Sequence, residues 1–335
     1  MQTTLRRRRL GARGPQVGAI GLGLMGMSGA YGPSDDAESV AAIHAAIDAG
    51  VTLLDTGDFY GMGHNELLLG RALRDRSRDD VAISVKFGGL VAPDGTWLGI
   101  DGRPEAVKTF LAYSLRRLGV DHVDIYRLAR LDPRVPIEET VGAIAELVEA
   151  GYVRHVGLSE VGAETIRRAA AVAPIADLQI EYSLLTRGVE DEILATLREL
   201  GIGMTAYGVL GRGLLSGRWT ADRGFREGDF RAYTPRFQAG NLERNLELVA
   251  RLDDIARDLG ITIAQLAIAW VAAQGEDIVP LVGVRTREQL TGALGAADVE
   301  LGPAELERIA AAVPRDAAAG ERYPAAHMAL LDSER

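Results

Sequence analysis

Short apolar runs of strand length alternate with longer amphipathic segments along most of the chain. The runs are mostly continuous rather than alternating in polarity, which is typical of strands that are buried on both faces of a parallel sheet. Eight runs predict strands, at residues 19–23, 51–56, 81–87, 122–128, 153–159, 177–183, 203–209 and 277–283.

The segments between these runs are rich in Ala, Leu, Glu and Arg and predict helices. Ser34 or Asp35 can cap the first helix, and Pro104 and Pro136 suit a first helical position. Eight strand–helix units favour an α/β fold, a (β/α)8 TIM barrel, over the alternative of a doubly wound sheet. The predicted helices are at residues 36–49, 65–75, 104–118, 136–150, 163–173, 189–200, 263–274 and 287–294.

Two regions depart from this alternation. Residues 211–240 form a long loop rich in Gly and Arg, of the kind that is usually a functional lid or disordered, and an extra helix is predicted at 242–259. A last helix at 303–313 precedes an irregular tail, residues 314–335. We expect a single domain over residues 1–335, with its core at about 10–313.

The N-terminal region has two interpretations. Arg6–Arg9 precede the moderately apolar stretch 17–27, which resembles a twin-arginine export signal. The alternative is a β-hairpin with arms at 5–10 and 17–22. Four glycines interrupt the apolar stretch, namely Gly18, Gly21, Gly23 and Gly26. The sequence therefore favours the hairpin and a cytoplasmic protein.

Composition excludes several classes of function. The 335 residues include 37 Lys and Arg and 47 Asp and Glu, a net charge of −10, which disfavours nucleic acid or an anionic membrane as a partner. No cysteine is present, which excludes disulfides and thiolate chemistry, and the five histidines lack metal-ligand spacing. No apolar run approaches the length of a membrane span. An oligomer is compatible with the sequence but does not follow from it.

One glycine motif invites a different interpretation. Gly21, Gly23 and Gly26 match the G-x-G-x-x-G spacing of a dinucleotide-binding turn. That turn opens a helix at its third glycine, whereas residues 27–33 here have the composition of a loop, and no strand ending in an acidic residue follows at the required distance. We therefore expect a loop after a first barrel strand.

The carboxyl ends of barrel strands carry function, and here they present Asp55, Tyr60 and Lys86. A free tyrosine has a pKa of about 10, too high for easy proton exchange at neutral pH. A nearby ammonium lowers that pKa, and a carboxylate keeps the ammonium charged and oriented. Such a set can protonate a carbonyl oxygen while hydride reaches the carbon.

Residues 54–73, LDTGDFYGMGHNELLLGRAL, resemble the D-T-A-x-x-Y-G…N-E…L-G-x-A-L signature of the aldo-keto reductases, and residues 83–87, ISVKF, resemble the lysine strand of that family. The resemblance extends from about Leu10 to Val313. It implies a (β/α)8 barrel that reduces aldehydes and ketones with NADPH. Asp55, Tyr60 and Lys86 stand at three places of the family's catalytic tetrad.

The fourth place differs from the family pattern. Ala129 stands where a histidine usually orients the carbonyl, and loss of such a donor costs about 2–4 kcal/mol in a site built around it. Tyr60 acts alone, or Arg127 or Arg130 contacts the substrate instead, or catalysis is weak. The run 129–133, ARLDP, together with residues 151–161 and 178–183, resembles pyridoxal reductases, which reduce pyridoxal to pyridoxine.

The resemblance also implies cofactor contacts. Ser159 and Gln179 would bind the nicotinamide carboxamide, although Glu160 replaces the usual asparagine, and Tyr207 would stack on the nicotinamide ring. Arg285 would hold the 2′-phosphate, which favours NADPH over NADH. The remaining implied contacts are Gly208, Leu210, Arg212, Gly213 and Leu214 around the pyrophosphate, and Gly283 and Gln289 at the adenosine end.

The sequence thus predicts an NADPH-dependent reductase of a small aldehyde, with pyridoxal as the first choice of substrate and no metal ion. Two alternatives stay open. One is a general aldehyde or ketone reductase of other substrates. The other is an NADPH-binding, redox-sensing regulatory module with little turnover, which the missing histidine favours.

Overall fold

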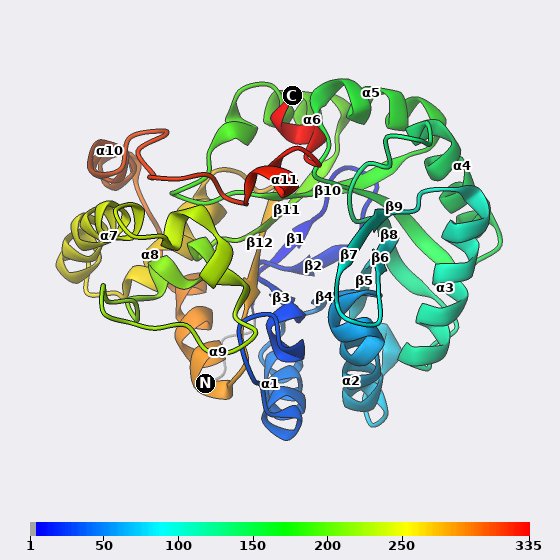
Figure 1. Cartoon of the computed structure of the whole chain (residues 1–335), viewed down its shortest axis with the longest axis horizontal. Helices are drawn as coiled ribbons and strands as arrows, with labels where there is room; N and C mark the ends of the chain where they lie inside the picture. Colours follow the sequence, from blue (N-terminus) through cyan, green and yellow to red (C-terminus); the bar gives the residue numbers. More distant parts are fainter. Residues whose placement is uncertain (1–4) are drawn as a thin grey trace.

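The structure is a computed structural model that describes residues 5–335. Eight parallel strands close into a barrel in the order β10–β11–β12–β3–β4–β5–β8–β9, which Figure 1 shows with helices arranged around it. This is the predicted (β/α)8 TIM barrel. Its strands are β3 (Gly21–Gly23), β4 (Leu53–Gly57), β5 (Ala82–Phe87), β8 (Val123–Leu128), β9 (Val153–Ser159), β10 (Ile175–Glu181), β11 (Gly203–Tyr207) and β12 (Ile278–Gly283).

A helix follows each barrel strand and packs outside the sheet. Nearly all the predicted boundaries agree with the structure within two residues. The exception is α6, because a 3₁₀ turn at Gly188–Glu190 takes the place of its expected first turn. The helices of this ring are α1 (Asp36–Asp48), α2 (His64–Leu73), α3 (Pro104–Leu118), α4 (Ile137–Glu149), α5 (Ala163–Val172), α6 (Ile193–Leu200), α8 (Ile263–Ala273) and α9 (Arg287–Leu294).

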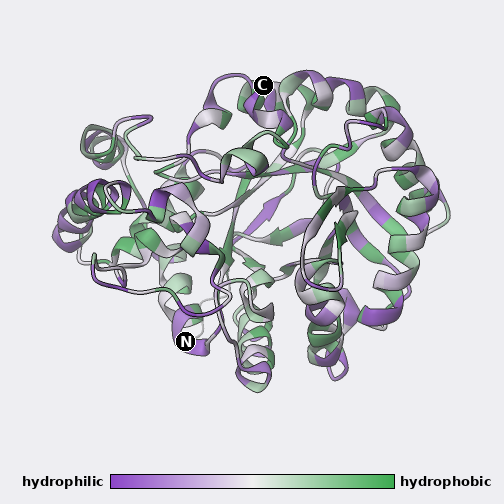
Figure 2. Ribbon diagram, in the orientation of Figure 1, coloured by the Kyte–Doolittle hydropathy of each residue, from purple (hydrophilic) through white to green (hydrophobic). Residues whose placement is uncertain are grey.

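Helix α4 illustrates how sequence spacing covers the barrel. Ile137, Val141, Ile144 and Leu147 recur every three or four residues and are all buried, so they form one stripe that faces the sheet. Burying one such side chain stabilises the fold by about 1.5–3 kcal/mol. Figure 2 shows hydrophobic residues along the strands and hydrophilic residues on the outer sides of the helices.

The predicted N-terminal hairpin closes the amino end of the barrel. Strand β1 (Arg7–Arg9) pairs antiparallel with β2 (Gln16–Gly18). The second arm is shorter than expected because β3 starts at Gly21. Leu10 and Val17 from this hairpin are fully buried in a cluster at the barrel floor. With the floor sealed, a ligand has access to the barrel interior only from the carboxyl end.

Four segments add to the barrel. A hairpin, β6 (Gly89–Val91) with β7 (Trp97–Ile100), was not predicted. The long loop contains three 3₁₀ segments, η5 (Gly211–Ser216), η6 (Phe230–Tyr233) and η7 (Pro235–Phe237), before α7 (Asn241–Asp258). Helix α10 (Pro303–Ala312) precedes the tail, which holds the short α11 (Ala325–Met328) and η9 (Asp332–Glu334).

Two properties of the described chain bear on its partners. Within residues 5–335, no single helix has the length and apolar character to cross a membrane, and only the bent pair of α7 and α8, at 88°, meets those two criteria jointly. The same residues contain no group of three or more His, Asp or Glu side chains that could hold a metal ion.

Candidate active site

Asp55, Tyr60 and Lys86 lie together at the carboxyl end of the barrel. Asp55 belongs to β4, Lys86 belongs to the neighbouring β5, and Tyr60 starts the 3₁₀ turn η2 (Tyr60–Gly63) just after β4. Lys86 Nζ donates a hydrogen bond to Asp55 Oδ1. The same nitrogen lies 5.3 Å from the centroid of the Tyr60 ring. The structure therefore brings together the three residues that the sequence pattern selected.

A buried hydrogen-bond network fixes Asp55 and Lys86. Asp55 Oδ2 accepts from Ser84 Oγ at 2.8 Å and from Gln179 Nε2 at 2.7 Å. Gln179 Oε1 in turn accepts from Lys86 Nζ at 2.8 Å. The ammonium is thus held by two acceptors from two different strands, which gives it one position beneath the Tyr60 ring.

Burial dominates the acidity of Tyr60 and Lys86. Burial lowers the pKa of Lys86 to about 8, against the opposing attraction of Asp55. Burial, together with the charge of Asp55, raises the pKa of Tyr60 well above its usual value, while the Arg130 guanidinium opposes that rise. The expectation that the lysine would leave Tyr60 with a lowered pKa is therefore wrong for this environment. Tyr60 remains protonated at neutral pH, the form that a proton donor requires.

The backbone next to Tyr60 holds its ring in place. Gly61 and Met62 both adopt left-handed conformations, with φ of 55° and 53°. This conformation is uncommon for methionine and costs backbone strain. The ring lies against Gly57, where an added Cβ would come within 3.2 Å of the ring. A tight turn and a close backbone approach thus set the ring position.

Ala129 places a buried methyl group where the family usually has a histidine, and the next residue, Arg130, carries a positive charge. Ala129 is only 1% exposed. The Arg130 guanidinium donates to Ala129 O at 2.6 Å and to the Tyr323 hydroxyl at 3.4 Å. Burial disfavours its charge, but Tyr207, Tyr323 and Glu160 outweigh burial and raise the pKa of Arg130. Arg130 is therefore a permanent positive charge beside Tyr60.

Arg127 does not reach the substrate space, which corrects the prediction of a substrate contact. Its side chain is fully buried inside the barrel. The guanidinium donates to Asp177 Oδ2 at 3.1 Å and to Ser84 Oγ at 2.9 Å. Because Ser84 donates to Asp55, Arg127 supports the site from below. Both of these partners lie inside the barrel, so the guanidinium is turned away from the open end.

The residues expected to bind nicotinamide lie at or near the carboxyl ends of three adjacent strands, β9, β10 and β11. Ser159 Oγ is buried and has no hydrogen-bond partner among residues 5–335, so a carboxamide would supply one. Both amide atoms of Gln179 are engaged by Lys86 and Asp55. The Tyr207 hydroxyl donates to Glu160 Oε1 at 2.6 Å. The carboxamide contacts expected of Ser159 and Gln179 and the stacking expected of Tyr207 stay predictions, and Gln179 in addition joins Lys86 to Asp55.

The loop expected around the pyrophosphate is a chain of tight turns in η5. Gly208 and Gly213 have φ of 69° and 100°, and Leu210 precedes the first turn. Leu214 is fully buried and packs in the core. The Arg212 guanidinium is buried and donates to Glu181 Oε2 at 2.7 Å. A phosphate contact from that guanidinium is therefore not what the structure shows, because Glu181 already compensates its charge.

Arg285 lies at the expected adenosine end, after Gly283 at the exposed end of β12. Its guanidinium donates to Tyr31 O at 3.1 Å. Burial and three like charges, Arg231, Arg226 and Arg223, lower the pKa of Arg285. Gln289 Oε1 accepts from the Arg285 backbone, so that side chain shapes the turn. Asp229 opposes this lowering and is itself bound by Arg231, so the Arg285 guanidinium is the group expected to meet a phosphate here.

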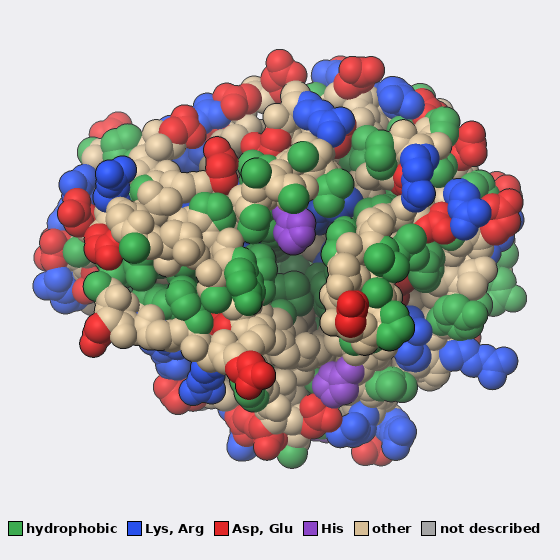
Figure 3. Space-filling view, in the orientation of Figure 1, with side chains coloured by type: hydrophobic (Ala, Val, Ile, Leu, Met, Phe, Trp, Pro, Cys, Tyr) green, Lys and Arg blue, Asp and Glu red, His purple; other side chains and the backbone are tan. Residues whose placement is uncertain are grey.

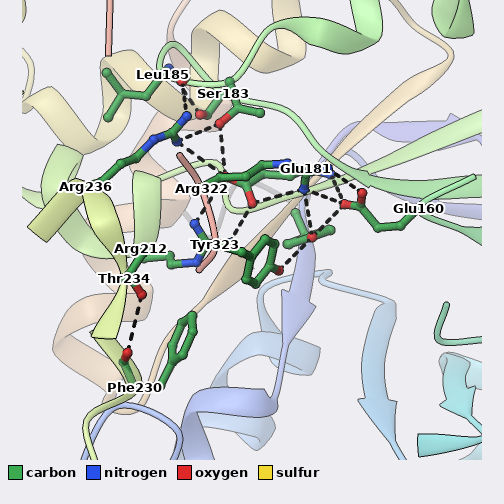
Figure 4. A network of polar contacts seen from close by, with 12 residues as sticks. Glu160, Glu181, Ser183, Leu185, Arg212, Phe230, Thr234, Arg236, Arg322 and Tyr323 are labelled. Atoms are coloured by element: carbon green, nitrogen blue, oxygen red, sulfur yellow. Dashed lines mark hydrogen bonds and ion pairs between the residues drawn. The ribbon is translucent and has the colours of Figure 1, made fainter. Parts of the chain in front are cut away.

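Sequence reasoning missed the polar network at the mouth of the barrel, shown in Figure 4. Glu160 directly follows β9 and Glu181 ends β10. Three guanidinium groups surround these carboxylates, those of Arg212, Arg236 and Arg322. The signal available in the sequence was Glu160 in place of the family's asparagine. Nothing in the composition of residues 314–335 indicated that Arg322 would reach it.

Comparisons with known proteins agree with this geometry. The sequence profile of the Aldo/keto reductase family matches residues 19–314. A probable aldo-keto reductase 1 of Glycine max is 42% identical over 316 residues, 94% of this chain and 91% of the relative. A glycerol dehydrogenase of Gluconobacter oxydans superposes with a TM-score of 0.84 at 29% identity, covering 92% of this chain and 95% of that structure.

A thermostable aldo-keto reductase solved with the inhibitor epalrestat gives a TM-score of 0.73 at 27% identity, over 92% of this chain and 100% of that structure. The chain belongs to the aldo/keto reductase family. It is an NADP-dependent oxidoreductase that acts on carbonyl groups or the corresponding alcohols.

Proposed function

We propose that this protein reduces an aldehyde to an alcohol with NADPH and that Tyr60 donates the proton. The observation that carries the proposal is the position of the Lys86 ammonium, bound to Asp55 and 5.3 Å from the centre of the Tyr60 ring. NADPH, when bound, supplies the hydride. As negative charge develops on the carbonyl oxygen, that oxygen becomes far more basic than a phenolate, so it takes the proton of Tyr60 despite the raised pKa of the phenol.

Arg130 takes the place of the missing histidine in this proposal. Its charge opposes the rise of the Tyr60 pKa, so it stabilises negative charge at the Tyr60 oxygen. Lys86 contributes a second positive charge, and Asp55 keeps that charge in place. Two cations near one phenol compensate for the phenolate left after proton transfer.

The cofactor would lie across the mouth from β9 to β12. Ser159 and Tyr207 would face the nicotinamide, the turns at Gly208, Leu210, Gly213 and Leu214 would line the pyrophosphate through their backbone, and Arg285 would meet the 2′-phosphate. The Ser159 hydroxyl, which no group within residues 5–335 binds, and the Arg285 guanidinium at the other end support this direction of binding.

Aromatic rings around the mouth support an aldehyde with a flat or apolar body. Phe59 lies between Tyr60 and Trp97, with centroids at 4.9 and 5.6 Å, and Phe230 lies 6.3 Å from Tyr323. Figure 3 shows this face hollowed at its centre, with hydrophobic side chains around the hollow. Pyridoxal, a flat aromatic aldehyde, suits such a wall, and it remains our first choice among small-molecule substrates, with cytoplasmic location as the matching expectation.

The second candidate function is a regulatory module that binds NADPH with little turnover. The buried methyl group of Ala129, where the family places a histidine, favours it. Consumption of NADPH measured with pyridoxal and with nitrobenzaldehyde separates the possibilities. A turnover rate with pyridoxal far above the rate with nitrobenzaldehyde supports pyridoxal as the substrate. Similar rates with the two aldehydes indicate a general reductase. Tight NADPH binding without turnover on any aldehyde contradicts the reductase proposal.

A further inference from the structure

The C-terminal tail crosses the mouth of the barrel and is anchored at both ends. We call residues 314–335 the strap. Near its start, Asn245 of α7 exchanges two hydrogen bonds with the backbone of Ala319, at 2.8 and 2.9 Å. Near its end, Asp332 Oδ2 accepts from Gly162 N at 2.9 Å. The strap is therefore held against the barrel on both sides of residues 322 and 323.

Arg322 is the central anchor of the strap. Its side chain is 3% exposed, and its guanidinium donates to Glu160 Oε1 at 2.9 Å and to Oε2 at 2.6 Å. The same group donates to Glu334 Oε1 at 2.6 Å. A buried guanidinium with bidentate geometry on one carboxylate is a specific contact, as Figure 4 shows.

Glu160 connects Arg322 to the expected nicotinamide site. It is a left-handed residue with φ of 53°, directly after Ser159, and its carboxylate also accepts from the Tyr207 hydroxyl at 2.6 Å. Burial opposes its charge, but Arg322 outweighs burial and holds the pKa of Glu160 well below its usual range. A strained, fully buried glutamate thus joins the strap to the ring that would face nicotinamide.

Tyr323 makes a second connection to the same ring. Its hydroxyl lies 3.0 Å from the Tyr207 hydroxyl and accepts from Arg130 at 3.4 Å. Its ring faces the Arg212 guanidinium at 4.3 Å. Tyr323 therefore contacts both Tyr207, at the end of β11, and Arg130, just beyond β8, and the neighbouring Arg322 donates to the Tyr207 hydroxyl at 3.4 Å.

We propose that Arg322 and Tyr323 are positioning residues of the nicotinamide half of the site, acting through Glu160, Tyr207 and Arg130. This inference rests on the proposed NADPH-dependent reduction. When the strap is bound across the mouth, it holds the Tyr207 ring in the orientation that would face the cofactor. It also holds the Arg130 guanidinium in place next to the substrate. Without it, Glu160 and Glu181 lose a buried cation, and Tyr207 loses the neighbours that set its orientation.

The test compares two ligands that share only the adenosine end. Variants Arg322→Gln, Arg322→Lys and Tyr323→Phe are titrated with NADPH and with 2′,5′-ADP, which lacks nicotinamide. We expect Arg322→Gln to weaken NADPH binding about tenfold or more, Arg322→Lys less, and Tyr323→Phe by a smaller factor together with a lower kcat. Binding of 2′,5′-ADP stays within about twofold. Tyr113→Phe, on the outer face of α3 and 56% exposed, is the matched control.

Unchanged NADPH affinity and kcat in all three variants would overturn the inference. An equal loss of affinity for NADPH and 2′,5′-ADP would also overturn it, because that result indicates a merely structural role. So would a gain in activity, because that result indicates that the strap blocks the site. If Arg322→Gln does not fold, Tyr323→Phe decides alone, since it removes one oxygen atom and keeps the ring over Arg212. A wild-type protein without any turnover instead counts against the proposed function.

Discussion

The Lys86 ammonium lies 5.3 Å from the centre of the Tyr60 ring while it donates to Asp55. Lys86 belongs to β5, and Tyr60 starts the turn that follows the neighbouring β4. They meet because β4 and β5 are in parallel register, with Gly57 opposite Lys86. In the proposed reaction this places a positive charge near the phenolate that Tyr60 becomes after proton transfer, so we expect the rate to depend on the protonation of Lys86.

Turnover should fall in alkaline solution. Burial lowers the pKa of Lys86 to about 8, so the ammonium loses its proton as the pH rises through that value and stops stabilising negative charge on Tyr60. We expect kcat at saturating NADPH to decline with an apparent pKa near 8. Lys86→Arg should move the decline to higher pH. A flat profile up to pH 10, or an unmoved decline in Lys86→Arg, would contradict this role of Lys86.

Replacement of Arg130 should slow the reaction without unfolding the protein. Its guanidinium supplies the charge that the family usually obtains from a histidine, and loss of one such donor costs a factor of about 10²–10³ in kcat. We expect a loss toward the lower end of that range for Arg130→Ala, since Lys86 remains, and a partial recovery in Arg130→Lys. The measurement is kcat with one aldehyde at saturating NADPH. A wild-type kcat in Arg130→Ala shows that Tyr60 needs no second cation.

Loss of Arg285 should reduce the preference for NADPH. The 2′-phosphate would meet Arg285, and one charged hydrogen bond contributes about 1.5–3 kcal/mol, or a factor of roughly ten or more in affinity. Arg285→Ala should weaken NADPH binding accordingly and leave NADH binding nearly unchanged. Fluorescence titrations with both nucleotides check this. An equal loss of affinity for NADPH and NADH would show that the 2′-phosphate binds elsewhere.

Asp58 should make the protein less stable above neutral pH. Burial and the charge of Glu66 raise the pKa of Asp58 to about 7, and no hydrogen-bond donor in the described part of the chain reaches Asp58 Oδ1. The folded form then binds more protons than the unfolded form between about pH 4 and pH 7, so stability declines as the pH rises across that window.

Asp58→Asn removes this charge and should raise the melting temperature at pH 8.5 by several degrees, a gain of the order of 2 kcal/mol. At pH 4 the gain should vanish. Differential scanning calorimetry at both pH values gives the comparison, with the exposed Asp121→Asn as control. Equal effects of Asp58→Asn at the two pH values would show that its charge is not the cause.

Much of the fold could be predicted because its rules are local. Continuous apolar runs, helix caps such as Asp35 and glycine C-caps such as Gly119 and Gly201 fix the element order, and eight units then leave the barrel as the favoured closure. The hairpin β6–β7 escaped prediction because its short arms, Gly89–Val91 and Trp97–Ile100, carry no clear alternation and lie across the mouth rather than in the sheet.

The site was predictable where strand ends determine neighbours, as for Asp55 and Lys86. The site was not predictable where the direction or the pKa of a side chain depends on burial by residues that are distant in the sequence. Arg127 points inward because of its position in β8, and the direction of the Tyr60 pKa shift depends on how much the fold buries that ring. Arg322 and Glu160 are 162 residues apart in the sequence, and no local sequence pattern predicts a contact between them.

The most direct test of the account is a single-turnover experiment on Tyr60→Phe with bound NADPH and an aldehyde that the wild type reduces. General acid catalysis contributes about 10²–10⁴ in rate, so we expect hydride transfer to slow by at least about a hundredfold while NADPH affinity stays at the wild-type value. A near wild-type rate of NADPH oxidation in Tyr60→Phe would contradict the assignment of Tyr60 as the proton donor.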